Sequence, residues 1–332
     1  MNNGLYLILR GWGREEADAL EGLLALMPGL GYDTLILEVG GHFAYTSHPE
    51  AREDNVLVAA DVKRLVSASN QHGLRMIPAY NCLGHQSHRE KAHALLRAHP
   101  EFNEQPDLNF DNFSFVNFYS WCPRHPDVWP FVFDLLDELV DAFDADGLHV
   151  GMDEVFVIGE CPRCRATGVG DLFAETVNRL HSHVVERRGL EMLMWGDRLL
   201  PPSLGYSHWE SSHNETHTAL DKVPRDIVMC DWHYEIMPDQ EYPSVAYFQE
   251  KGFRVWPAGC YHLEAVKRLI EVSVRDATPL MLGYLATFWW EPSALLDRLT
   301  ARVELSDPPS QIDRAAACVA IGAGFARSNS FR

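Results

Sequence analysis

Eight short apolar runs alternate with segments of helical periodicity along this chain of 332 residues. The runs are apolar throughout, which is typical of strands covered on both faces, as in parallel sheets. This spacing predicts an α/β fold with one (β/α)8 barrel over residues 1–332, because that fold needs about 250 residues and tolerates insertions. A doubly wound sheet is the alternative, but no Gly-x-Gly-x-x-Gly follows the first run. The expected strands are 5–9, 34–39, 74–80, 147–152, 191–195, 226–232, 252–257 and 283–289.

One connection between these strands is too long and too irregular to be a helix alone. Residues 90–121, after the third strand, are rich in Asn, Pro and Phe, and we expect an insertion there that forms part of a pocket wall. Nothing in the sequence resembles a linker or an internal repeat, which predicts a single domain. The expected helices are 15–30, 61–73, 127–143, 171–188, 263–274 and 311–326.

The net charge of −19, from 47 acidic and 28 basic residues, argues against nucleic acid or an anionic membrane as a partner. No apolar run approaches the roughly 18 residues of a transmembrane helix. Met1–Leu9 lacks a basic start and a long apolar stretch, so we expect no signal peptide. Seven cysteines, an odd number, then indicate reduced thiols and a cytoplasmic location. The sequence leaves the oligomeric state open, a homodimer included.

Acidic and aromatic residues dominate the carboxyl ends of the expected strands, where barrel active sites lie. Asp153 and Glu154 follow the fourth strand. Charges at the end of a buried strand need an ion-pair partner, contact with solvent or a functional role. A helix cap alone would also explain such a pair. Aromatic walls with carboxylates suit an uncharged polar ligand with apolar faces, such as a pyranose. The other candidate substrate-binding residues are Glu38, His85, Trp195, Asp197, Trp232, Tyr234, Tyr261, Trp289 and Glu291.

These motifs together resemble glycoside hydrolase family 20, the β-N-acetylhexosaminidases, and are most similar to the hexosaminidase-D-like members. The family signature His-x-Gly-Gly-Asp-Glu reads His149-Val-Gly-Met-Asp-Glu154 here, with Met152 in place of the second Gly. His85 in Leu-Gly-His-Gln resembles the family's Pro-Gly-His turn. Met-Trp195-Gly-Asp resembles its Gly-Trp-Asp, and Trp289-Trp-Glu291 resembles its Trp-x-Glu. The resemblance spans most of the chain.

Two positions depart from the family pattern. Either Arg10 or Arg14 could take the place of the family's arginine near the first strand, which grips the sugar hydroxyls. The family's Tyr-x-Asp near the seventh strand is matched only by Tyr261-His-Leu263, without the Asp. Tyr234 and Tyr261 are therefore both candidates for the tyrosine that binds the acetamido oxygen.

The resemblance implies an exo-acting β-N-acetylhexosaminidase that removes terminal β-linked GlcNAc or GalNAc with retention. In such substrate-assisted enzymes the nucleophile is the sugar's own 2-acetamido oxygen. Glu154 would be the general acid and base, kept protonated by burial and by its neighbour, and Asp153 would orient the acetamido group. Trp289 would form the platform under the ring, and Glu291 would bind the outer hydroxyls. The implied partner is a small-molecule or oligosaccharide substrate, and no cofactor or metal is expected.

Three other functions fit parts of the pattern. A retaining mechanism with two protein carboxylates would use Glu154 with Glu291 or Glu38, and would not depend on an N-acetyl group. A metal-dependent barrel enzyme would lose its activity to a chelator. A non-catalytic sugar-binding barrel is disfavoured, because a binding protein has no use for a proton donor.

Cys161-Pro-Arg-Cys164 has the spacing of half a zinc site. Two further ligands would be needed, and Cys122 and Cys82 supply them only if their loops converge. We therefore interpret the pair as ordinary reduced thiols, with a metal site as the alternative.

Overall fold

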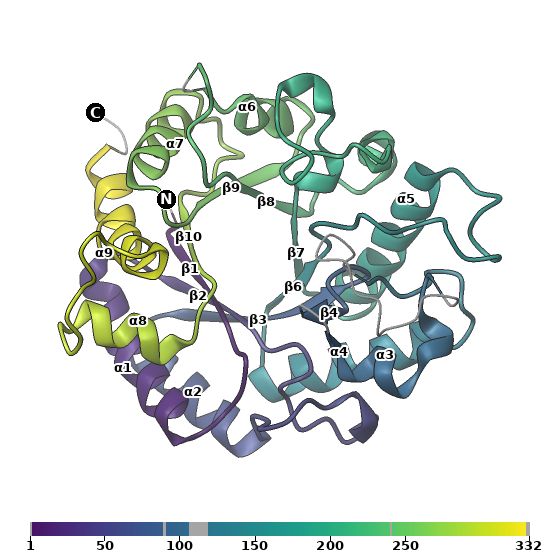
Figure 1. The fold of residues 1–332 in the computed structure, drawn as a ribbon, viewed down its shortest axis with the longest axis horizontal. Helices are drawn as coiled ribbons and strands as arrows, with labels where there is room; N and C mark the ends of the chain where they lie inside the picture. The colour runs from purple at the N-terminus through teal and green to yellow at the C-terminus, as the bar shows by residue number, and fades with distance from the viewer. Residues whose placement is uncertain (1, 89–90, 106–118, 240, 330–332) are drawn as a thin grey trace.

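The computed structural model describes residues 2–88, 91–105, 119–239 and 241–329. Its parallel strands close into a barrel in the order β1-β2-β3-β6-β7-β8-β9-β10, and β10 pairs with β1 (Figure 1). The predicted (β/α)8 barrel is thus confirmed, and each predicted strand end lies within two residues of the observed one. The strands are β1 Gly4–Ile8, β2 Thr34–Glu38, β3 Arg75–Cys82, β6 Gly147–Gly151, β7 Glu191–Trp195, β8 Val228–Trp232, β9 Arg254–Gly259 and β10 Leu285–Phe288.

Helices form a ring around the barrel (Figure 1). They are α1 Arg14–Leu30, α2 Ala59–Gln71, α3 Ala94–Ala98, α4 Val128–Phe143, α5 Val169–His181, α6 Pro243–Glu250, α7 Leu263–Arg275, α8 Pro292–Leu299 and α9 Gln311–Asn329. The predicted helix 171–188 instead ends at His181 and continues as a π-helix over Ser182–Arg187. Short 3-10 helices lie at Pro49–Ala51, Pro100–Phe102, Asp197–Leu199, Pro202–Leu204 and Thr216–Lys222.

Large side chains fill the interior of the barrel. Tyr6, Trp195 and Trp256 are each at most 2% exposed and pack against the aliphatic side chains of the other strands. The remaining members of this layer are Ile36, Ile77, Ala79, Leu193, Val228, Cys230, Ala258 and Leu285. The barrel is therefore a packed core rather than a pore, as is usual for this fold.

The segment after β3 forms the predicted insertion. Ser87–His88 (β4) pairs with Lys91–Ala92 (β5), and α3 follows. Further on, Asn103 pairs antiparallel with Trp121, and the Trp121 N–H donates to the Leu83 carbonyl at 3.0 Å. These contacts anchor both ends of the segment 104–120 against the barrel, although 106–118 lie outside the described residues.

Within the described ranges, none of the helices is long and apolar enough to span a membrane.

Candidate active site

The turn after β6 presents two acids at the carboxyl end of the barrel. Its backbone has positive φ angles at Gly151 (69°), Met152 (74°) and Glu154 (48°). A Cβ atom on Gly151 would lie 2.4 Å from Oδ1 of Asn81, so only glycine fits there. Met152 is fully buried, and its left-handed conformation costs about 1–2 kcal/mol. The family's second Gly would adopt that conformation freely, which explains why glycine is usual at this position.

His149, the first residue of this motif, lies fully buried beneath the acids. Its Nδ1 accepts the Gly151 N–H at 3.1 Å, and its ring contacts Tyr6 and Trp195. Burial lowers the pKa of His149 to about 3, so the ring is neutral and acts as an acceptor. It shapes the turn rather than supplying a charge.

Asp153 is held by two side chains from the third strand and its loop. Asn81 Nδ2 donates to Oδ1 at 2.8 Å, and His85 Nε2 lies 3.2 Å from Oδ2. Burial alone would raise the pKa of Asp153, but the charge of His85 and these hydrogen bonds lower it. Burial alone would lower the pKa of His85, yet the charge of Asp153 raises it well above its ordinary value. The two therefore form an ion pair at neutral pH.

Glu154 shares this histidine and is fixed through its backbone. Its Oε2 lies 3.2 Å from His85 Nε2, and its N–H donates to Oδ2 of Asp197 at 3.0 Å. The same oxygen of Asp197 accepts from Arg198 Nε at 2.6 Å, in a pair with only 1% of each side chain exposed. Burial raises the pKa of Asp197 to about 6, although Arg198 opposes this. Arg198 also donates to the carbonyl of Trp209 at 2.6 Å, which ties a second wall of the site to the same network.

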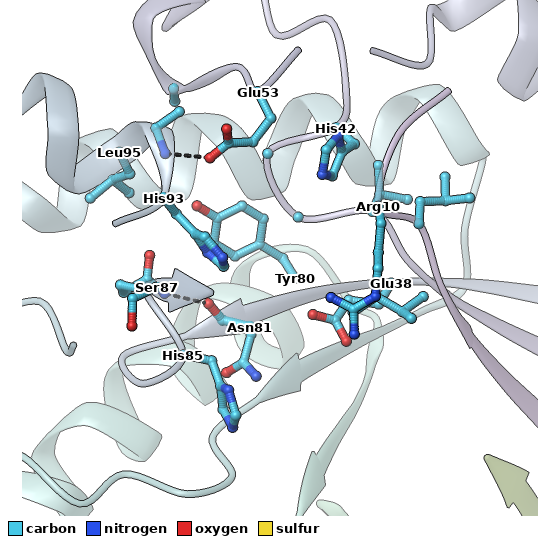
Figure 2. Close-up of a pocket in the computed structure, with 18 of the residues that line it drawn as sticks. Arg10, Glu38, His42, Glu53, Tyr80, Asn81, His85, Ser87, His93 and Leu95 are labelled. Carbon is cyan, nitrogen blue, oxygen red and sulfur yellow. Dashed lines mark hydrogen bonds between the residues drawn. The ribbon is translucent and has the colours of Figure 1, made fainter. Parts of the chain in front are cut away.

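Two cavities share a wall that consists of His85, Asp153 and Trp289. The larger, of about 890 Å³, lies over β1, β2, β3 and the insertion, and we call it the polar lobe (Figure 2). The smaller, of about 420 Å³, lies over β6 and β8 to β10, and we call it the aromatic lobe. Both volumes are within the range of small-molecule sites. The aromatic lobe is lined, besides the shared wall, by Glu154, Ser207, Trp209, Glu210, Trp232, Tyr234, Glu235 and Tyr261.

The two candidate tyrosines both line the aromatic lobe, but their hydroxyl groups have different partners. Tyr234 accepts the indole N–H of Trp289 at 2.9 Å and lies 3.2 Å from the hydroxyl of Thr287. Tyr261 donates to Oε1 of Glu235 at 2.8 Å. The proton of Tyr261 is thus engaged by a carboxylate, whereas Tyr234 is fixed by a donor on its oxygen.

Arg10 and Glu38 lie together in the polar lobe (Figure 2). Arg10 donates to the carbonyl of Trp289 at 3.1 Å, while Glu38 accepts the hydroxyl of Tyr6 at 2.8 Å. Burial raises the pKa of Glu38, although Tyr6, His85 and Arg10 act in the opposite direction. Arg14, the alternative arginine, has a side chain that is 95% exposed and pairs with Asp18 on α1. The structure therefore brings Arg10, and not Arg14, to the cavity.

Three of the predicted site residues line neither cavity. Trp195 is 1% exposed in the barrel core, and Asp197 is buried beneath Glu154. Glu291 is exposed at the residue before α8. Trp195 and Asp197 therefore support the site from below, and the predicted contact of Glu291 with sugar hydroxyls stays a prediction.

Several lining residues were not predicted from the sequence. Asn81, Trp209 and Glu210 lie in segments that have no local motif of their own. The Asn81 position carried one signal, since it directly follows the apolar run 74–80. Trp209 and Glu210 follow a loop rich in Pro, Ser and His, whose path only the folded chain reveals.

Two curated relatives match part of this chain. A β-hexosaminidase of Akkermansia muciniphila is 32% identical over 109 residues, which is 32% of this chain and 21% of that protein. One of Vibrio furnissii is 22% identical over 176 residues, covering 52% of this chain and 26% of the relative. The chain thus matches about a quarter or less of the length of these curated relatives.

Solved structures share the fold. The β-N-acetylhexosaminidase of Bacteroides fragilis superimposes with a TM-score of 0.65 at 16% identity, over 94% of this chain and 65% of that one. A family 20 exo-β-N-acetylglucosaminidase of Vibrio harveyi superimposes with a TM-score of 0.65 at 16% identity. The match covers 100% of this chain and 58% of that one. The family model described as glycosyl hydrolase family 20, catalytic domain, matches residues 35–303, and the chain therefore belongs to glycoside hydrolase family 20.

Proposed function

We propose that this protein is an exo-acting β-N-acetylhexosaminidase that removes terminal β-linked GlcNAc or GalNAc with retention of configuration. The observation that carries the proposal is the placement of Asp153 and Glu154 at one turn, with Asp153 on the wall between the two lobes. Membership of family 20 and the β-hexosaminidase relatives support the same activity. The substrate is a small glycoside or an oligosaccharide.

In the proposed first step, the substrate's acetamido oxygen attacks the anomeric carbon and the glycosidic bond breaks. Glu154 gives its proton to the departing oxygen. Asp153 accepts the acetamido N–H and stabilises the positive charge that develops on the oxazolinium-like ring. We assign the anionic role to Asp153, which Asn81 and His85 both hold, and the proton transfer to Glu154, which shares only His85 with it.

In the second step, Glu154 takes a proton from a water molecule. That water attacks the anomeric carbon and opens the oxazolinium-like ring, which restores the acetamido group. Two displacements at one carbon give net retention. The chemistry uses no protein nucleophile and no divalent ion.

We assign the acetamido group to the aromatic lobe. Its methyl group would pack against Trp232 and Trp289, and its oxygen would accept from Tyr234, whose hydroxyl is already positioned by Trp289. Arg10 and Glu38 would then face the sugar hydroxyls or the aglycone from the polar lobe.

A panel of nitrophenyl β-glycosides tests the proposal. We expect hydrolysis of the N-acetylglucosaminide and N-acetylgalactosaminide, no turnover of the matched glucoside and galactoside, and no loss of the initial rate in chelator. Equal turnover of sugars with and without the 2-acetamido group would replace this mechanism with one that uses two protein carboxylates.

A further inference from the structure

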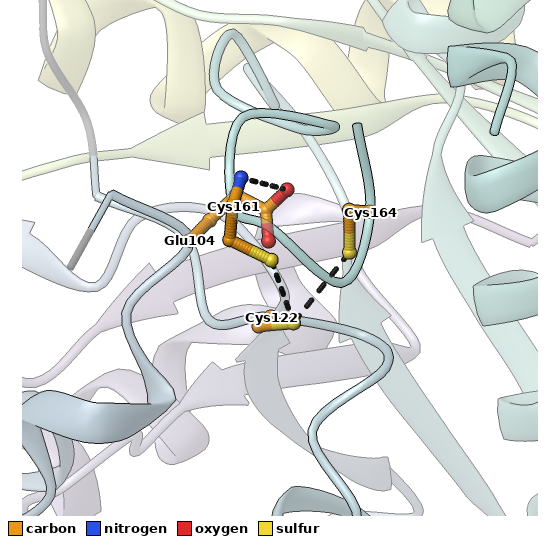
Figure 3. Close-up of side chains that lie close together, drawn as sticks. All are labelled: Glu104, Cys122, Cys161 and Cys164. Carbon is orange, nitrogen blue, oxygen red and sulfur yellow. Dashed lines mark hydrogen bonds between the residues drawn. The ribbon is translucent and has the colours of Figure 1, made fainter. Parts of the chain in front are cut away.

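A cluster of side chains of the kinds that bind metal ions lies outside the candidate active site. It consists of Glu104, Cys122, Cys161 and Cys164, whose ligand atoms all lie within 4.8 Å of one another (Figure 3). Cys122 Sγ is 3.3 Å from Cys161 Sγ and 3.5 Å from Cys164 Sγ. Cys82, which the sequence offered as a possible fourth ligand, is not part of this group. The carboxylate of Glu104 is the fourth member instead.

The backbone brings these four residues together from two separate segments. Glu104 and Cys122 belong to the anchored ends of the insertion, where the Cys122 N–H donates to Phe102 at 2.6 Å. Cys161 and Cys164 lie on one tight turn in the loop after β6, closed by the Cys164 N–H donating to Cys161 at 3.0 Å. A Cys-x-x-Cys turn of this kind presents two sulfurs to one ion.

The surroundings of Glu104 are a second observation that points to a bound cation, independent of the clustering of the ligand atoms. The residue is 0% exposed, and its Oε1 accepts the N–H groups of Gly159 at 2.6 Å and Glu160 at 2.8 Å. Its other oxygen, Oε2, is buried and has no hydrogen-bond partner among the described residues. A buried carboxylate oxygen without a partner is costly unless a cation compensates for it.

We propose that Glu104, Cys122, Cys161 and Cys164 bind one structural Zn²⁺ ion. Three soft thiolates and one carboxylate form a closed set of four ligands, which is the number that structural zinc sites use, and zinc binds both cysteine sulfur and carboxylate oxygen. In a tetrahedral site with Zn–S bonds of about 2.3 Å, the sulfurs lie roughly 3.8 Å apart, so the two Cys122 spacings of 3.3 and 3.5 Å need to widen by about half an ångström or less. All four residues are at most 1% exposed, which leaves no open position for substrate.

The ion would clamp the insertion to the loop that leaves the catalytic turn. Cys161 is seven residues after Glu154, so a fixed Cys161 limits how far this loop moves. The role is structural, because the ion takes no part in bond breaking. Its presence does not depend on the proposed hydrolase activity.

Metal analysis of protein purified without added metal tests this directly. We expect one zinc per chain in the wild type. The variant Cys164→Ala should lose it, while Cys318→Ala, which removes an equally buried thiol on α9, should retain it. Glu104→Gln keeps an oxygen for the backbone N–H groups but weakens the fourth ligand, so zinc transfer to a chelator should be at least about tenfold faster.

A measurement on the wild type alone covers the case in which the variants do not fold. Cobalt substituted into the native protein should give the near-ultraviolet thiolate charge-transfer bands and the strong visible bands of a tetrahedral site. Removing zinc should also lower the melting temperature of the wild type but not change that of a folded Cys164→Ala protein. Absence of stoichiometric zinc together with absence of the cobalt bands would overturn the proposal. A Cys122–Cys161 disulfide in protein from a reducing cytosol would overturn it equally.

Discussion

The two lobes of the site share a wall but differ in chemistry. The polar lobe contains charged groups that mostly have partners in the protein, such as Glu53 with Arg97 at 2.8 Å and Glu38 with Tyr6. The aromatic lobe instead has flat side chains and two tyrosine hydroxyls around the catalytic turn. Aromatic walls select a ligand by its shape, whereas charged side chains can form hydrogen bonds with hydroxyl groups in different positions. We infer that the aromatic lobe determines which sugar is cleaved and that the polar lobe tolerates variation. Five predictions test this comparison.

The largest effect is expected at the two acids of the turn after β6, Asp153 and Glu154. Glu154→Gln removes the proton donor, so natural disaccharides should lose about 10²–10⁴-fold in rate. Nitrophenyl glycosides need little protonation and should be spared. Asp153→Asn should slow both substrates, because it disturbs the acetamido group itself, and it should bind an oxazoline-mimicking thiazoline much less tightly. Equal losses on both substrates for Glu154→Gln, or unchanged thiazoline binding to Asp153→Asn, would contradict these roles.

Within the aromatic lobe, the two tyrosines are a matched pair. Tyr234→Phe should reduce kcat/KM roughly 10- to 150-fold, because a hydrogen bond to a group that becomes charged contributes about 1.5–3 kcal/mol. Tyr261→Phe, whose hydroxyl is bound to Glu235, should change it little. The opposite ranking would assign the acetamido oxygen to Tyr261.

Trp289 lines both lobes, and its loss should weaken binding more than folding. Stacking on a sugar ring contributes about 1–3 kcal/mol, so Trp289→Ala should weaken inhibitor binding roughly 5- to 150-fold. Trp289→Phe keeps a flat platform but lacks the N–H that fixes Tyr234. Its inhibitor affinity should therefore lie between those of the wild type and Trp289→Ala. If Trp289 were chiefly a core residue, truncation would cost about 3–5 kcal/mol of stability instead, which thermal melting would reveal.

The polar lobe is tested by the two arginines near the first strand. Arg10→Ala should raise KM about 2- to 10-fold, because Arg10 is exposed at the cavity rim and such contacts are modest. Arg14→Ala, on the outer face of α1, should have no effect on kinetics. An equal effect of both variants would remove Arg10 from the site.

The smallest effect concerns pH. Because the folded protein raises the pKa of His85 above its ordinary value of 6.5, the protonated ring stabilises the fold. That stabilisation is fully present below about pH 6.5 and is lost as the pH rises through the folded pKa. The difference in unfolding free energy between wild type and His85→Gln should therefore shrink from pH 6 towards alkaline pH. A constant difference in denaturant titrations would show that His85 is not charged.

The sequence predicted the strands well because buried parallel strands are apolar along their whole length. It missed α6 and α8, which are short and begin with proline at the first helical turn. The two acids proposed as catalytic were predictable because they directly follow a strand. Asn81 carried only the signal that it follows an apolar run, and Trp209 was not predictable because its position depends on how distant loops converge. Glu104 and Cys161 are 57 residues apart, and no local pattern connects them.

The packed layer beneath the site has a kinetic consequence. Since Tyr6, Trp195 and Trp256 block the barrel axis, substrate, departing alcohol and incoming water all use the carboxyl-end mouth. In the proposed mechanism, the cyclised intermediate therefore meets whichever hydroxyl compound occupies that mouth. An added alcohol should compete with water for it and give glycosyl transfer products whose share rises with alcohol concentration. The ratio of transfer to hydrolysis then reports how open the entrance is while the terminal sugar is still held.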